Sequence, residues 1–261
     1  MRTVTVERYV TPLREGGSLP AIIEADDLHM YVLKFRGAGQ GPRALIAEII
    51  GGGIARALDL PVPEIVLAEL DPALAATEPD PEIQDLLRAS GGLNLALDYL
   101  PGALTFDPAA DHVDPALASR IVWLDAFISN VDRSARNTNL LVWQQRLWLI
   151  DHGAALYFHH GWMGEAEAAD RPFPLIKDHV LLPLAQDLDA AHSQAMAKLS
   201  PRIFAQILAD IPDQWLRLEH ADAPVFEDST EHRARYQAYL ERRLQNAERL
   251  LAGIQEARDA G

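Results

Sequence analysis

Three polar side chains in one stretch of the sequence have the types and spacing that metal and phosphate chemistry needs. Asp132 and Asn137 lie in the loop-like segment DRSARN, and Asp151 opens an Asp-His-Gly sequence a little further on. Between them, the apolar runs 140–143 and 147–150 flank a polar Gln-Gln-Arg. Two short apolar runs around a polar turn are the pattern of a β-hairpin. The pattern predicts that the strands bring the polar residues at their outer ends together.

A hairpin folded about Gln144 would set Asn137 opposite Asp151. A slip of one residue in the turn would change the partner but leave both residues at the open end of the hairpin. Directly opposed residues on neighbouring strands have Cβ atoms about 5 Å apart. Amide and carboxylate oxygens at that distance can share a divalent cation, and Mg²⁺ prefers oxygen ligands. Asp132 precedes this pair in a loop, where its carboxylate could meet a hydroxyl substrate.

The composition excludes several classes of partner. The chain has 261 residues, a formal net charge of -15 and no cysteine. A strongly acidic chain argues against a nucleic-acid partner, and no apolar window is long enough for membrane insertion. The absence of cysteine excludes disulfides and thiolate metal sites. We therefore expect a cytoplasmic protein of one large domain or two lobes.

The first hundred residues have a β-rich pattern that contains a glycine turn. Strands are predicted over 3–10, 19–25 and 29–35, and the turn between the first two contains Gly16, Gly17 and Ser18. Glycines in such a turn let backbone N–H groups approach a phosphate closely. These residues taken alone are explained more simply by a plain hairpin turn.

The third predicted strand carries a lysine among apolar residues. Period-two alternation puts Val32 and Lys34 on one face and Tyr31, Leu33 and Phe35 on the other. Because lysine is almost never buried without a partner, Lys34 either snorkels from an edge strand or holds an anion.

A helix is predicted over 42–57, and Glu48 lies among its apolar residues. The run Gly51-Gly52-Gly53 lies in the interior of the same helix. Because each glycine there costs roughly 1 kcal/mol, either the helix breaks or another element packs too closely for side chains.

The motifs together match a known superfamily. Asp132 and Asn137 have the spacing of the protein-kinase loop H-R-D-x-x-x-x-N, and Asp151 begins Asp-His-Gly where that superfamily has Asp-Phe-Gly. The Asp-Arg order resembles the Asp-Arg-His-x-x-Asn loop of HipA-like kinases and phosphatidylinositol 3- and 4-kinases. The chain thus resembles a HipA-like or phosphatidylinositol-kinase-like protein. Ser134 stands where that family has His.

The resemblance implies an α+β, two-lobed protein-kinase-like fold, with a β-rich N-lobe over 1–100 and a mainly helical C-lobe over 101–261. Helices are predicted over 81–89, 115–130, 178–187, 201–211 and 212–220, with one long helix over 230–258. The resemblance also assigns residues around ATP. The phosphate-covering loop would contain Gly16, Gly17 and Ser18, and Val32 would line the adenine. Lys34 would bind the phosphates while paired with Glu48, with Glu64 as the alternative acid. The interlobe hinge, whose backbone groups would hydrogen-bond adenine, would be formed by Asp98, Tyr99 and Leu100.

The implied reaction is transfer of the γ-phosphoryl group of ATP to a hydroxyl of an unidentified protein or small molecule. Asn137 and Asp151 would bind Mg²⁺, and Asp132 would orient and deprotonate the acceptor. Arg133 or Arg136 could add positive charge near the transferred group or form a structural ion pair.

Two alternatives to an active kinase follow from the same residues. A nucleotide-binding scaffold without activity is one, because the loop His is missing. A metal-dependent hydrolase using Asp125, Asp132, Asp151 and His152 is another, and it gives Lys34 no role. Within the kinase interpretation, Ser18 resembles a loop serine that some HipA-like kinases phosphorylate themselves, and an added phosphate there would repel the nucleotide.

Overall fold

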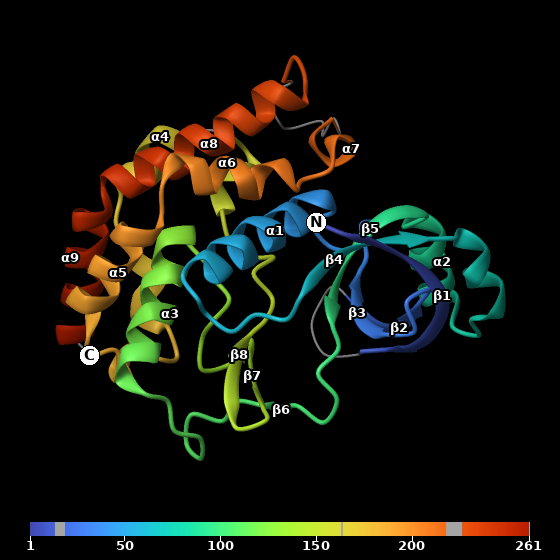
Figure 1. The fold of residues 1–261 in the computed structure, drawn as a ribbon, viewed down its shortest axis with the longest axis horizontal. Coiled ribbons are helices and arrows are strands. Elements are labelled where there is room, and N and C mark those ends of the chain that lie inside the picture. The colour runs from blue at the N-terminus through green and yellow to red at the C-terminus, as the bar shows by residue number, and fades with distance from the viewer. Residues whose placement is uncertain (14–18, 163, 218–225, 261) are drawn as a thin grey trace. The chain divides into compact units, whose positions relative to one another are not determined.

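The computed structural model describes residues 1–13, 19–162, 164–217 and 226–260 (Figure 1). The chain is a mixed α+β protein that divides into two compact units. The first unit consists of Met1–Leu45 and Pro63–Gly102, and the second of Ile46–Val62 and Ala103–Gly261. No helix in the described ranges combines the length and the apolar character that a bilayer crossing requires.

A closed five-stranded barrel forms the first unit. The strand order is β1-β2-β3-β5-β4, in which β1 and β4 are parallel and the other described pairs are antiparallel. A 3-10 helix and a short α-helix lie between β4 and β5 in the chain. The elements are β1 (Thr3–Pro12), β2 (Ala21–Ala25), β3 (Met30–Lys34), β4 (Ile65–Leu70), η1 (Pro72–Thr77), α2 (Pro81–Ala89) and β5 (Gly92–Asp98).

The barrel core follows the alternation predicted for the third strand. Tyr31 and Leu33 are fully buried, whereas Val32 and Lys34 on the opposite face are only partly covered. Inward-facing residues of the neighbouring strands complete the apolar core, among them Val4, Val6, Ala21, Ile23, Val66, Ala68 and Ala96. The predicted alternation is therefore confirmed.

The second unit is mainly helical and also contains a small three-stranded sheet in the order β6-β7-β8. Most of α1 (Pro42–Ala57) belongs to this unit. The other elements are β6 (Leu104–Thr105), α3 (Pro115–Ile128), β7 (Leu140–Trp143), β8 (Arg146–Leu149), η2 (Tyr157–His160), α4 (Glu165–Asp170), η3 (Pro174–Asp178), η4 (Leu182–Leu184), α5 (Leu188–Lys198), α6 (Pro201–Ala209), α7 (Asp213–Leu216), α8 (Ser229–Gln245) and α9 (Ala247–Asp259).

Helix α3 is the buried centre of this unit. It packs against α5 and α9, which lie beside it in Figure 1. Trp123 and Phe127 are fully buried and stack with ring centroids 5.2 Å apart, and Phe204 of α6 lies 6.1 Å beyond Phe127. Because α3 is rigidly packed, the loop that follows it starts from a well-defined point.

Three predicted helices differ from the structure. The one predicted over 212–220 ends at Leu216, and residues 218–220 lie outside the described ranges. The segment 178–187 is not one helix, because it contains only the end of η3 and the short turn η4, and α5 begins at Leu188. Pro183 lacks the N–H that a helix interior needs. The predicted helix over 230–258 is interrupted at Asn246, whose side-chain amide donates to Asp170 Oδ1 and to the Arg242 carbonyl, both at 2.9 Å.

Candidate active site

The end of α3 positions the loop that carries the predicted base. Ser129 adopts a left-handed conformation (φ 53°), which ends the helix. The buried Arg243 of α8 donates to the carbonyl oxygens of Ala126 (2.7 Å) and Phe127 (3.0 Å). Burial lowers the pKa of the Arg243 guanidinium. The Ala126 carbonyl also accepts from the Ser129 N–H at 3.3 Å, so Arg243 adds to the capping of this helix end and fixes the start of the loop.

We call residues 130–139 the Asp132 loop. The carboxylate of Asp132 is half-buried and accepts hydrogen bonds at Oδ2 from Asn137 Nδ2 (2.9 Å) and Asn139 Nδ2 (3.3 Å). Asn139 Nδ2 also donates to the Asp132 carbonyl at 2.6 Å, and the Asp132 backbone N–H donates to Asn130 Oδ1 at 3.2 Å. The structure therefore brings the predicted base and the predicted metal ligand Asn137 together. Asn139 had not been singled out from the sequence.

The hairpin forms where it was predicted, but its register differs by one residue. Leu140 pairs with Leu149, and Gln144 and Gln145 form the turn with φ values of 49° and 61°. Two successive left-handed residues are typical of a type I′ two-residue turn. Extending this register sets Thr138, not Asn137, opposite Asp151. Asp151 itself is left-handed (φ 55°), and its Oδ1 accepts from the Gly153 N–H at 3.3 Å.

Glu48 of α1 holds the Asp-His-Gly segment. Its Oε2 accepts from the His152 backbone N–H at 2.9 Å, and its Oε1 lies 3.2 Å from His152 Nδ1. Both side chains are fully buried. Glu48 therefore fixes the residue that follows the predicted metal ligand Asp151, a contact that the sequence did not indicate. Its pairing with Lys34 stays a prediction, and the alternative acid Glu64 binds Arg2 at 2.9 Å.

The glycine run in α1 is explained by close packing, because the helix continues through it without a break. A Cβ atom on Gly51 would lie 2.6 Å from His152 Cβ, and one on Gly53 would lie 2.7 Å from Ile207 Cγ2. Only glycine allows these approaches. The sequence left open a break in the helix or close packing of another element, and close packing is therefore correct.

Gly51→Ala is expected to destabilise the protein by about 1–3 kcal/mol, the usual cost of overpacking. It should also weaken any activity that depends on Asp151, because His152 must move. Gly53→Ala is the matched control, since it crowds Ile207 of α6 and leaves His152 untouched. Denaturant unfolding and turnover measured for both variants test this. Equal losses of turnover at equal stability would contradict a specific role for the Gly51 contact.

The remaining predicted nucleotide-binding residues lie on the barrel unit. Lys34 and Val32 of β3 pair with Leu95 and Leu97 of β5. Asp98 ends β5, and the Tyr99 N–H donates to the Met30 carbonyl at 3.0 Å. Burial raises the pKa of Asp98 above its ordinary value. The roles of these residues and of Leu100 stay predictions.

The predicted phosphate loop falls on residues that the structure does not describe. Gly16, Gly17 and Ser18 lie outside the described ranges.

The oxygen donors of the two predicted metal ligands are of the kind that Mg²⁺ prefers. Asn137 and Asp151 offer one amide and one carboxylate oxygen, and Mg²⁺ usually binds one or two carboxylates together with water and substrate phosphates. Among the described residues, no three His, Cys, Asp or Glu side chains gather as a metal site. Two of the four residues named for the hydrolase, Asp125 and His152, are fully buried and already bound by Arg133 and Glu48.

Asp125 of α3 is the centre of a second buried cluster. Its Oδ2 accepts from Arg133 Nε at 2.5 Å and lies 2.9 Å from His179 Nε2, and its Oδ1 accepts from Asn130 Nδ2 at 2.9 Å. Burial alone would raise the pKa of Asp125, but the charge of Arg133 and the His179 hydrogen bond outweigh it and hold the pKa well below its usual range. Two roles were considered for Arg133: a positive charge near the transferred group, or a structural ion pair. The structure supports the second role, with Asp125 as the partner.

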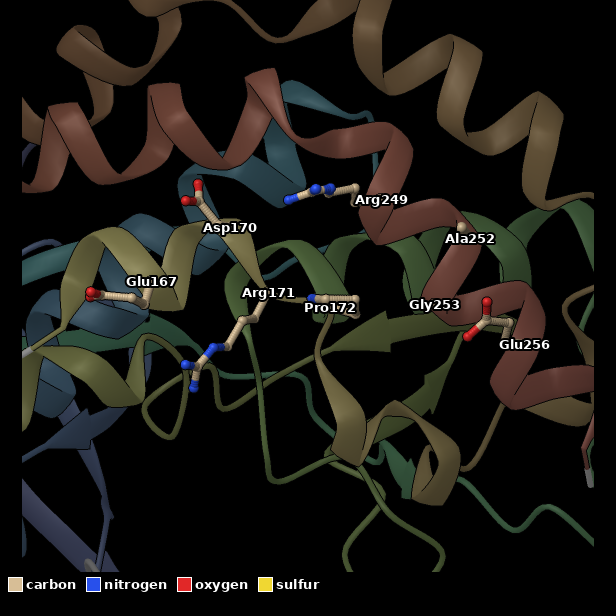
Figure 2. Close-up of a pocket in the computed structure, with 8 residues that line it drawn as sticks. All are labelled: Glu167, Asp170, Arg171, Pro172, Arg249, Ala252, Gly253 and Glu256. Carbon is tan, nitrogen blue, oxygen red and sulfur yellow. The ribbon is translucent and has the colours of Figure 1, made fainter.

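A surface groove elsewhere in the second unit holds none of the predicted site residues. It lies between α9 and the end of α4 and has a volume of about 440 Å³ (Figure 2). Charged side chains of both signs line it, among them Glu167, Asp170, Arg171, Arg249 and Glu256. Since Asp170 is also bound by Arg242, we assign the groove no chemistry.

The fold is that of kinases. The protein CtkA, described as a Helicobacter pylori proinflammatory kinase, superposes with a TM-score of 0.61 at 12% identity, covering 97% of this chain and 98% of its own. The Golgi casein kinase gives a TM-score of 0.53 at 12% identity over 97% of this chain and 73% of its own. Its structure with Mn and ADP bound gives 0.54, over 98% and 74%.

The sequence itself places the chain in a family. The model of the HipA-like kinase family matches residues 6–247. The chain therefore belongs to the HipA-like kinases, as its Asp132 loop and Asp-His-Gly sequence predicted. No protein with a curated description matches it significantly.

Proposed function

We propose that this protein is an ATP- and Mg²⁺-dependent kinase that transfers the γ-phosphoryl group to a hydroxyl of a protein or small molecule. The observation that carries the proposal is the arrangement of the Asp132 loop, in which Asn137 Nδ2 lies 2.9 Å from the Asp132 carboxylate. Family membership and the kinase fold support it. The Golgi casein kinase structure with Mn and ADP supports a nucleotide and a divalent metal as ligands.

In the proposed mechanism, Asp132 orients the acceptor hydroxyl and takes its proton. The acceptor oxygen forms the new bond to the γ-phosphorus as the bond to the β,γ-bridging oxygen breaks, and ADP leaves with the electron pair. Lys34 binds the phosphates, while Val32, Asp98, Tyr99 and Leu100 line the adenine.

Asn137 and Asp151 would hold Mg²⁺. When bound, the metal neutralises charge on the phosphate oxygens. The loop of Gly16, Gly17 and Ser18 covers the phosphates in this scheme. Its backbone N–H groups suit phosphate oxygens. The half-buried position of Asp132 between two asparagine amides keeps its carboxylate oriented before the acceptor arrives.

Binding of ATP with Mg²⁺ is expected to stabilise the fold. At a hundredfold excess over Kd, ligand linkage contributes about 2.7 kcal/mol. For a chain of this size the melting temperature should rise on the order of 5–10 °C. Thermal melts with ATP alone, with Mg²⁺ alone and with both separate the contributions. No shift with millimolar ATP and Mg²⁺ together would remove the kinase and the scaffold interpretations alike.

A further inference from the structure

His179 reaches the Asp132 loop from a segment far along the chain. It follows η3, and its Nε2 lies 2.9 Å from Asp125 Oδ2. Among the described residues, Asn130 and Arg133 also donate to Asp125, and they lie on either side of Asp132 in the sequence. One buried carboxylate thus accepts from the side chains of residues on both sides of the predicted base, and His179 is a further donor to it.

The hydrogen bonds of His179 define its tautomer. The Leu181 backbone N–H donates to His179 Nδ1 at 3.0 Å, so Nδ1 accepts and carries no proton. A neutral imidazole then has its proton on Nε2, which donates to Asp125. The side chain is 3% exposed. His179 therefore bridges a backbone N–H of its own segment and the carboxylate beneath the Asp132 loop.

Backbone contacts join the same two segments. Ser134 and His179 form an antiparallel β-bridge, and the Val180 N–H donates to the Arg133 carbonyl at 3.1 Å. Arg133 Nη1 in turn donates to the Asn139 carbonyl at the other end of the loop. The Asp132 loop is consequently held by the buried Asp125 carboxylate and by the backbone of residues 179 and 180.

We propose that His179 is a positioning residue for Asp132. Its Nε2–H fixes the Asp125 carboxylate, and that carboxylate fixes Asn130 and Arg133 around the base. The contact that matters is the one to Asp125, and the Leu181 contact serves only to hold the tautomer. The effect on turnover rests on the proposed kinase function, whereas the effect on loop order does not.

Two amide substitutions separate the contacts of His179. In His179→Gln the terminal amide can occupy the Nε2 position and donate to Asp125. In His179→Asn the shorter side chain can place its oxygen at the Nδ1 position and accept from Leu181, but it cannot reach Asp125. The two variants are therefore matched in chemistry and differ in which bond they keep.

Hydrogen exchange of the amides of residues 132–139, measured without nucleotide, is the deciding experiment. We expect exchange in His179→Gln to stay close to wild type and exchange in His179→Asn to be faster. Turnover should fall roughly 10- to 100-fold in His179→Asn alone, with the KM for ATP unchanged, because a displaced base costs about that much. Equal exchange in the two variants would overturn the proposal.

The proposed function and the positioning role fail in different ways. A wild type without ATP turnover removes the kinase, yet faster exchange in His179→Asn than in His179→Gln still supports the positioning role. If His179→Asn does not fold, ¹⁵N spectra of the wild-type imidazole decide, with the His179 signals assigned by their loss in His179→Gln. A protonated Nε2 and a bare Nδ1 support the bridge to Asp125, and the opposite tautomer overturns it.

Discussion

Replacing Asp132 with alanine is expected to lower phosphoryl transfer by about 10²–10⁴, the usual contribution of a positioned general base. The melting shift produced by ATP with Mg²⁺ should stay nearly intact. The reason is that the proposed base meets the acceptor hydroxyl and is not a proposed metal ligand. The hydrogen bond that Asn137 would lose is made by its Nδ2, whereas an amide binds a metal through its oxygen. Turnover and a Mg²⁺ titration of the melting temperature at fixed ATP measure the two effects separately.

Asp151→Asn is the comparison for Asp132→Ala. Asp151 is proposed to bind the metal, so losing its charge should reduce the Mg²⁺-dependent part of the melting shift and abolish turnover. A hydrolase with Asp132 and Asp151 as common metal ligands would lose metal equally in both variants. That outcome would overturn Asp132 as the base. A scaffold would show no turnover in the wild type and a normal shift with ATP.

The local elements of this protein could be predicted from the sequence because each has its own start and stop signals. Helix α1 spans Pro42–Ala57 and helix α2 spans Pro81–Ala89, as predicted. Proline at the first helical position favours both starts. The alternation in β3 likewise gave the buried face of the barrel strand directly.

The hairpin shows where local patterns fail. Its apolar runs were evident, but Gln144 and Gln145 both adopt left-handed conformations that usually need glycine or asparagine. The Gln-Gln-Arg sequence lacks the glycine or asparagine that usually indicates a two-residue turn, so the predicted register was one residue off. The error matters because the observed ladder, which pairs Leu140 with Leu149, does not set Asn137 opposite Asp151.

The buried contacts around the site could not be predicted from the sequence, for a different reason. Glu48 and His152 lie 104 residues apart, and His179 lies 54 residues from Asp125. Such partners meet only after the chain has folded. The pattern also predicted a helix over 178–187, where the structure instead has only the end of η3 and the turn η4. Among the contacts of Asp125, the one with Asn130 spans 5 residues and the Asp125–Arg133 pair spans 8, so both join residues that are close in sequence.

The same pair leads to the largest expected effect on stability. Arg133→Met is expected to destabilise the protein by about 3–5 kcal/mol, because it leaves the buried Asp125 carboxylate without its cation. Arg136→Met is the matched control. Arg136 lies on the same loop but is exposed, so its loss should change stability by no more than about 0.5 kcal/mol. Denaturant unfolding of both variants measures the difference.

The pH dependence of the stability lost in Arg133→Met identifies the cause of that loss. In the wild type the pKa of Asp125 is lowered, so its contribution to stability is present above the ordinary carboxyl range and is lost only as the pH falls through the lowered value. In Arg133→Met burial dominates and raises the pKa, so Asp125 takes up a proton on mild acidification. The stability gap between wild type and variant should therefore narrow from about pH 7 to about pH 5. A gap that stays constant with pH would show that Arg133 acts through packing and its carbonyl contacts, and not through the charge of Asp125.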